Sequence, residues 1–102
     1  MEPLKGSCKK YLRGLAHNLK PSAFVGQKGV TQALTKEIDA ALDAGELIKV
    51  RFVDFKLKAQ KQDLINKIAR ATDSYVAGMI GHVAILYRPH KDMEKRKIRL
   101  PE

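Results

Sequence analysis

Residues 21–31 read PSAFVGQKGVT, and this stretch holds the boundary between two predicted elements of the fold. Residues 23–25 form a short apolar run, which is typical of a buried strand. The tetrad GQKG at 26–29 follows, and Thr31 is a residue type that caps the first turn of a helix. The stretch therefore predicts a strand, a tight glycine loop and a helix start in immediate succession.

A glycine loop between a strand and a helix suits a phosphate group. Glycines allow close approach of the backbone and accept positive φ angles. The helix start offers free N–H groups and partial positive charge, and Lys28 adds a full charge. KH-type RNA-binding domains grip the nucleotide backbone with a GxxG loop of this kind. An ordinary tight turn has the same pattern, so the loop alone leaves both interpretations open.

A second GxxG occurs at residues 78–81, but its middle residues, Met79 and Ile80, are apolar. It lies in a β-rich region, because residues 75–80 and 83–88 are two extended runs separated by Gly81-His82. That spacing predicts a β-hairpin with a two-residue turn. We therefore interpret this second GxxG as structural.

Upstream of the first strand, a helix is expected from Ser7, a candidate N-cap, to about Asn18, with Pro21 ending it. Its apolar residues repeat at helical spacing, which predicts one buried stripe: Cys8, Tyr11, Leu12, Leu15 and Leu19. Its basic residues fall within an arc of about 100°, roughly opposite that stripe: Lys9, Lys10, Arg13, His17 and Lys20. One side of the helix is thus expected to pack and the other to be basic. Because the basic side lies beside the glycine loop in the sequence, the two are expected to form one surface.

Downstream, a second helix is expected to run to Ala44 with Gly45 at its C′ position. Residues 47–52, LIKVRF, predict a half-buried strand with Lys49 and Arg51 on the face opposite its apolar residues. A third helix is expected to end near residue 72. Its inward positions are predicted to be Leu57, Leu64, Ile65, Ile68 and Ala71.

The order α-β-α-β-α-β-β predicts the α+β class, with a four-stranded mixed sheet and helices packed on it. At 102 residues the chain is expected to be a single domain, residues 1–102. Its core is expected at about 7–89. Residues 90–102 form a charged tail, for which a mobile, solvated state is the expectation.

Net charge is the clearest compositional feature: 20 Lys and Arg against 11 Asp and Glu give +9. Residues 1–29 hold six bases and one acid, and residues 87–102 hold six and three. Residues 30–46 carry one base against four acids, so the second helix is expected to face away from an anionic partner. Clustered positive charge attracts phosphates, which favours a nucleic-acid partner over simple solubility.

Several function classes find no support in the sequence. Cys8 is the single cysteine and the three histidines lack metal-ligand spacing, so we expect no metal, no cofactor and no enzymatic activity. No membrane-length apolar run and no secretory leader are seen, so we expect a cytoplasmic protein. With no Trp and three each of Phe and Tyr, backbone recognition is favoured over a base-stacking platform.

Linked motifs add a family resemblance that covers about residues 7–100. They are RGLAHNLKP at 13–21, the glycine loop at 26–29, ELIKV at 46–50, IGH at 80–82 and LYRP at 86–89. In this order they resemble the CRM domain, the chloroplast RNA splicing and ribosome maturation module, and most of all its stand-alone bacterial YhbY-like members. The segment at 53–56, VDFK, departs from the polar turn expected there.

The resemblance implies a fold similar to the C-terminal domain of translation initiation factor three. It also implies a protein that binds ribosomal RNA in precursors of the large ribosomal subunit. The protein is expected to be monomeric. The expected RNA-binding residues are Gly26, Gln27, Lys28, Gly29, Lys9, Lys10, Arg13, His17, Lys20 and Arg88. For Arg88 a structural ion pair is the other interpretation. Intron splicing, translation control and a protein-interaction module that meets an acidic partner stay open as alternatives.

Overall fold

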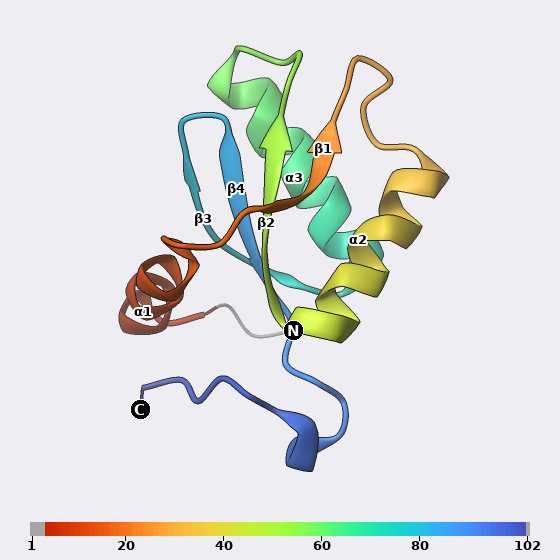
Figure 1. The fold of residues 1–102 in the computed structure, drawn as a ribbon. Helices are drawn as coiled ribbons and strands as arrows, with labels where there is room; N and C mark the ends of the chain where they lie inside the picture. The colour runs from red at the N-terminus through yellow and green to blue at the C-terminus, as the bar shows by residue number, and fades with distance from the viewer. Residues whose placement is uncertain (1–3, 102) are drawn as a thin grey trace.

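The computed structural model describes residues 4–101 and has four strands, three α-helices and a short 3₁₀ turn (Figure 1). In chain order these are α1 (Gly6–Ala16), β1 (Pro21–Val25), α2 (Gln32–Gly45), β2 (Leu47–Phe52), α3 (Lys58–Thr72), β3 (Tyr75–Ile80), β4 (Val83–Tyr87) and η1 (Met93–Lys95). The sheet order is β1-β2-β4-β3. Only the β1–β2 pair is parallel, so the sheet is mixed, as predicted.

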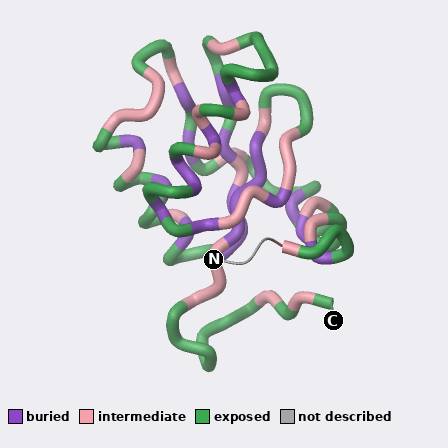
Figure 2. Tube along the Cα trace, turned by 180° about the vertical axis from the view of Figure 1, so that it is seen from behind, coloured by how far each residue is buried: buried purple, intermediate pink, exposed green. Residues whose placement is uncertain are grey.

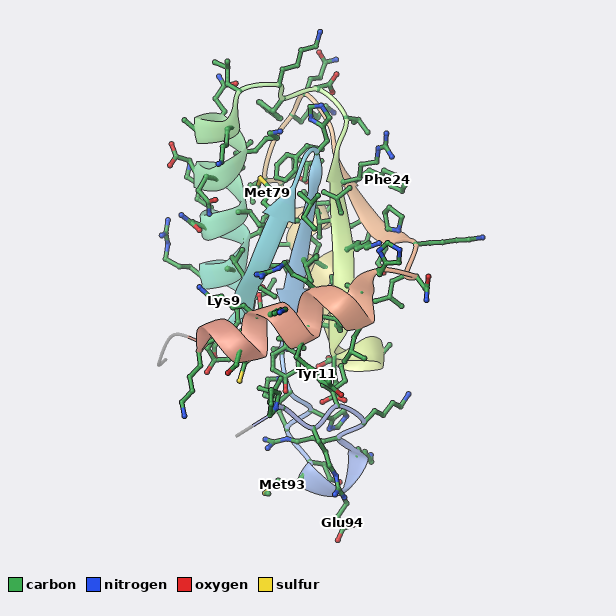
Figure 3. The ribbon with its side chains drawn as sticks, turned by 90° about the vertical axis from the view of Figure 1, so that its left-hand side faces the viewer. Lys9, Tyr11, Phe24, Met79, Met93 and Glu94 are labelled. Atoms are coloured by element: carbon green, nitrogen blue, oxygen red, sulfur yellow. The ribbon has the colours of Figure 1, made fainter. Side chains whose placement is uncertain are left out.

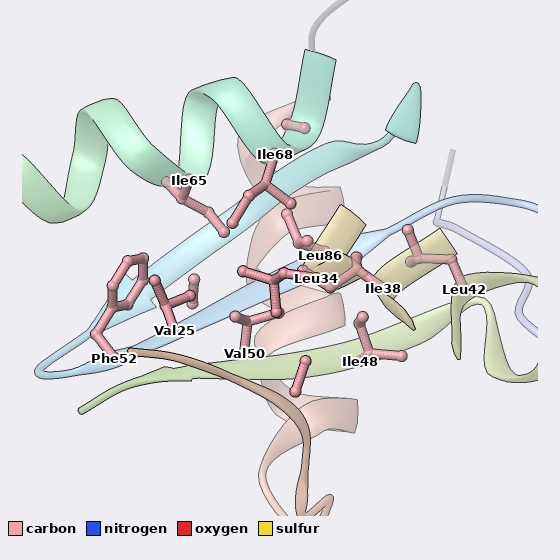
Figure 4. Packing of buried hydrophobic residues seen from close by; sticks show 13 residues of the cluster. Val25, Leu34, Ile38, Leu42, Ile48, Val50, Phe52, Ile65, Ile68 and Leu86 are labelled. Atoms are coloured by element: carbon pink, nitrogen blue, oxygen red, sulfur yellow. The ribbon is translucent and has the colours of Figure 1, made fainter. Parts of the chain in front are cut away.

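The main core lies between the sheet and the two helices α2 and α3, which cover the same face (Figure 4). Strand alternation puts Ala23 and Val25 of β1 on this face, together with Ile48, Val50 and Phe52 of β2. Ile38 of α2 and Ile65 of α3 meet them and are fully buried. Each such aliphatic side chain contributes about 1.5–3 kcal/mol by leaving water.

The helix on the opposite face of the sheet is α1, which crosses one end of the strands (Figure 3). Its buried residues, Cys8, Leu12 and Ala16, repeat every four positions. Leu12 and Ala16 pack on Leu47, Ala77, Ile85 and Tyr87 in a second, smaller apolar cluster. The molecule therefore has three layers, α1, sheet and α2/α3, with the sheet incompletely covered on the α1 side.

Two local predictions are confirmed by hydrogen bonds and backbone angles. Thr31 caps α2, because its Oγ1 accepts a hydrogen bond of 3.1 Å from the backbone N–H of Leu34. Gly81 has φ +59° in the turn between β3 and β4, where Ile80 pairs with Val83. The predicted two-residue hairpin turn, with glycine first, is confirmed.

Three predictions about α1 are wrong. The helix begins at Gly6 after Lys5, with no side-chain cap, so Ser7 lies inside the first turn. It ends at Ala16 rather than near Asn18. The buried stripe is rotated from the predicted one, because Tyr11, Leu15 and Leu19 are each about two-fifths exposed. Cys8 and Leu12 of the predicted stripe are buried, and packing on the sheet buries Ala16 in place of the other three residues.

The end of α2 also differs from prediction. Gly45 is the last helical residue, and it is Glu46 that has a positive φ, +63°. Glu46 is 2% exposed, and its carboxylate accepts hydrogen bonds from the backbone N–H groups of His90, Lys97 and Ile98. These contacts hold a conformation that glycine would adopt more easily.

Glu46 also corrects the prediction of a mobile tail. Its carboxylate accepts hydrogen bonds from His90 before the η1 turn and from Lys97 after it. Ile98 and Leu100 pack against the α1-side cluster. At the chain's end, the Cys8 thiol donates to the carbonyl oxygen of Pro101 at 3.4 Å. The tail is mostly exposed yet follows a defined path under the sheet (Figure 2).

In α3, the predicted inward positions are correct for Ile65 and Ile68 but wrong for Leu57 and Ala71, which are exposed. Lys61 is instead 5% exposed. Its ammonium donates to the carbonyl oxygen of Gly81 at 2.8 Å and lies 3.2 Å from Nδ1 of His82. Lys61 thus joins α3 to the hairpin turn through hydrogen bonds. The spacing of apolar residues could not predict this, because Lys61 is not apolar.

Candidate nucleic-acid interface

The glycine loop is a tight turn at the carboxyl end of β1. The N–H of Gly29 donates to the carbonyl oxygen of Gly26 at 2.9 Å, and Gly29 has φ +70°. Gln27 and Lys28 at its tip are exposed. The turn leads to the first turn of α2, whose free N–H groups and partial positive charge lie nearby. This end of the molecule is therefore suited to an anion.

Helix α1 does not lie beside this loop, contrary to the expectation of one adjoining surface. In Figure 1 the loop stands at the top of the sheet, while α1 lies low on its left side. Short separation along the chain is misleading here, because β1 runs from α1 towards the loop and keeps them apart. A surface shared by both must include the sheet between them.

The sheet supplies that connection through two cations. Lys49 and Arg51 alternate with the core residues of β2, so both lie on the α1 face. They are the charged residues of the four described strands, which contain no Asp or Glu. Arg51 is exposed and pairs in register with Phe24, two residues before the loop begins.

The edge of α1 that faces the open sheet carries three of the predicted residues. Lys9, Arg13 and His17 are spaced by four and so lie along one side of the helix. Arg13 and His17 line a groove with Lys49 and with Ile80, Val83 and Ile85 of the hairpin. Lys49 donates from Nζ to the carbonyl oxygen of His17 at 3.1 Å.

Arg13 is partly engaged in packing. Its guanidinium donates to the carbonyl oxygen of Ala77 at 3.1 Å, and its stem crosses Gly78 so closely that a Cβ there would stand 2.8 Å from Arg13 Cδ. The first glycine of the second GxxG therefore makes room for Arg13. This agrees with the structural role inferred for that motif.

The remaining predicted residues separate into two groups. Lys10 lines a shallow apolar hollow on the outer side of α1 with Tyr11 and Leu15, and Lys20 is exposed just before β1. Arg88 lies elsewhere, at the end of β4. Its guanidinium pairs with Asp39 at 2.6 Å and Asp43 at 2.8 Å.

Arg88 also donates to two carbonyl oxygens, those of Thr72 at 2.7 Å and Asp39 at 2.9 Å. Its side chain is 14% exposed, and it joins β4 to α2 and the end of α3. The structural interpretation of Arg88 is the correct one, and we leave it out of the candidate interface. These contacts also neutralise part of the acidic surface of α2, which packs on the sheet face opposite α1.

The candidate interface is thus a cationic track that runs from the edge of α1 over the open sheet face to the glycine turn. We define it by Lys9, Arg13, His17, Lys49, Arg51 and Lys28. Lys49 and Arg51 were absent from the residues expected from the sequence. The alternation in LIKVRF already separates them from the core, but only the sheet order shows that they lie between α1 and the loop.

Two further searches of the structure are negative. No helix among residues 4–101 is long and apolar enough to cross a membrane. Within the same residues, no group of three or more His, Cys, Asp or Glu side chains is placed to hold a metal ion.

The fold and the track define a small three-layer α+β domain with a basic face and an exposed glycine turn. Comparison with known proteins then identifies the family: residues 4–88 match the CRS1 / YhbY (CRM) domain, and the chain belongs to that family.

Individual relatives match almost the whole chain. A Haemophilus influenzae protein named RNA-binding protein is 41% identical over 99% of this chain and 98% of its own length. The Bacillus subtilis protein YqeI, also named for RNA binding, is 36% identical over 96% of this chain and 99% of its own length. The solution structure of a hypothetical protein from Staphylococcus aureus superposes with a TM-score of 0.83 at 36% identity, covering 96% of this chain and 99% of that one.

Proposed function

We propose that this protein binds structured RNA through the cationic track, and that its target is ribosomal RNA in assembling large ribosomal subunits. The observation that carries the proposal is the placement of Lys49 and Arg51 on a strand face free of acids, between the basic edge of α1 and the glycine turn. Membership of the CRM family and the RNA-binding names of the relatives support the same partner. The assignment to the large subunit rests on the family resemblance.

The proposed mechanism is neutralisation of backbone phosphates. Lys28 and the backbone of the turn meet one phosphate, and the α2 N-terminus stabilises its charge. Arg51, Lys49 and the α1 edge meet further phosphates along the track. Release of counterions from the RNA then supplies much of the binding free energy, without reading base identity.

The first test is Lys28→Glu. Reversing this charge removes a charge-assisted contact and adds repulsion, so affinity for a structured ribosomal RNA fragment should fall about tenfold or more. Lys67→Glu is the matched control, because Lys67 is exposed on α3, on the other side of the sheet. Filter binding measures both, and circular dichroism verifies folding. Equal weakening by the two variants would show that total charge, rather than the turn, determines binding.

The choice of partner is tested in cell extracts. The protein should co-sediment with large-subunit precursor particles, and nuclease treatment should abolish that association. Association that survives nuclease would assign the basic face to an acidic protein partner instead. Crosslinking in cells followed by sequencing of the attached RNA identifies the RNA itself, and reads that map to introns or messenger RNAs would replace the ribosomal assignment.

A further inference from the structure

A row of four side chains crosses the sheet beyond the end that α1 covers. Strand register defines it: Phe24 of β1 pairs with Arg51 of β2, Arg51 with Val83 of β4, and Val83 with Ile80 of β3. The neighbours of Phe24 in β1, Ala23 and Val25, are both fully buried in the main core, so Phe24 must point to the α1 face. All four side chains therefore lie side by side on one surface.

This row is apolar yet uncovered. Phe24 is 55% exposed and Ile80 63% exposed, while Val83 is half-buried. One step closer to α1, Ile85 is buried. Figure 3 shows Phe24 standing clear of α1, near the loop end of the sheet. The row is thus left open because α1 crosses the strands only at their other end.

Charge and position indicate what occupies the row. Arg51 is its one charged member, and no strand contributes an acid. Phe24 lies two residues before Gly26, so the aromatic ring adjoins the glycine turn that is proposed to hold the RNA backbone. An aromatic ring beside an arginine and a phosphate-binding turn is suited to a nucleotide, whose base stacks on the ring while its phosphate meets the cation.

We propose that an unpaired nucleotide stacks on Phe24, with Arg51 contacting the adjacent phosphate and Ile80 extending the apolar surface. This inference rests on the proposed RNA-binding function. It narrows the RNA ligand to a structured RNA in which an unpaired nucleotide, in a loop or bulge, lies next to an RNA helix. Paired bases in a duplex present no free face to the ring.

The absence of tryptophan from the chain provides a direct test. Phe24→Trp introduces the single tryptophan of the chain at the proposed stacking position, and an RNA hairpin with an unpaired loop should quench the tryptophan fluorescence. A blunt RNA duplex of the same length should quench it much less. Met93→Trp is the control, because Met93 is 74% exposed in the tail and lies at the opposite end of the molecule (Figure 3).

Affinity measurements separate this inference from the proposed function. Phe24→Ala should lower affinity for the hairpin about tenfold and leave duplex affinity within twofold, because loss of one stacked base removes a contact of this order. Met93→Ala should change neither, and thermal unfolding confirms that each variant is folded.

If hairpin binding is unchanged in Phe24→Ala and still weakened in Lys28→Glu, the stacking site is overturned while RNA binding stands. The stacking site would also be overturned if the fluorescence of Phe24→Trp did not change on addition of RNA but did change on addition of a protein fraction from the cell extract. If the wild-type protein binds neither RNA, the proposed function fails together with the inference.

Discussion

At the scale of single residues, the two glycines of the turn have different roles and can be separated. Gly29 has φ +70°, so Gly29→Ala should lower the free energy of unfolding by about 1–2 kcal/mol. Gly26 has no such constraint, and a Cβ there would stand 3.7 Å from Asp54 Oδ2, an ordinary contact. Gly26→Ala should therefore leave the free energy of unfolding unchanged. It should weaken RNA binding, because the added methyl group lies where the RNA backbone would contact the turn.

Urea unfolding and RNA titration of the two variants provide the measurement. If Gly26→Ala binds RNA like the wild type, the backbone of the turn does not make close contact with the ligand.

Residue-scale prediction from the sequence is correct where the determinant is local. Thr31 caps α2 because the hydroxyl and the N–H it satisfies are three residues apart. Gly45 is not the C′ residue, because contacts with a tail about fifty positions away hold Glu46 in the positive-φ conformation. A local sequence pattern cannot predict a contact between residues so far apart in the chain.

At the scale of elements, the tail depends on the ionisation of one carboxylate. Burial raises the pKa of Glu46, but the N–H groups of His90, Lys97 and Ile98 outweigh it, and the pKa lies below 4.5. Because the folded-state value is the lower one, the ionised carboxylate stabilises the protein fully above pH 4.5, its unfolded value. This contribution is lost as pH falls through the folded-state pKa.

We therefore expect hydrogen exchange at the Lys97 and Ile98 amides to be slow at neutral pH and to lose protection in acid, before the sheet amides do. Glu46→Gln is the control variant and should have weak protection of these two amides at every pH. Protection that is independent of pH in the wild type would mean that apolar packing of the tail alone holds it.

Strands and helices were predictable in order and type because each has its own periodicity. LIKVRF alternates and is β2, and the run before Gly81-His82 pairs with the run after it. The tail was not predictable in this way. Its anchors are backbone N–H groups and two isolated apolar residues, Ile98 and Leu100, so nothing periodic marks it as part of the fold.

At the scale of the whole molecule, the sequence indicated an anionic partner but not how the basic residues are arranged in space. The distribution of charge along the sequence indicated the basic α1 and the glycine turn. The two were expected to adjoin in space because they are close in the sequence. The sheet order puts β2 beside β1, which adds Lys49 and Arg51 and makes the two parts continuous. The sequence left two interpretations open for Arg88 for the same reason, since its acidic partners on α2 are over forty residues away.

The track also determines how binding should depend on salt. The association constant Kobs falls as salt rises, so a plot of log Kobs against log salt concentration has a negative slope. Each neutralised phosphate contributes about −0.9 to this slope on a duplex and about −0.7 on a single strand. Lys28→Gln and Arg51→Gln should each make the slope shallower by about that amount, and the double variant by about twice as much. Lys67→Gln on α3 should leave the slope unchanged even though it removes the same charge. Slopes that fall equally in all three single variants would indicate a diffuse field of the +9 molecule rather than a track of defined contacts.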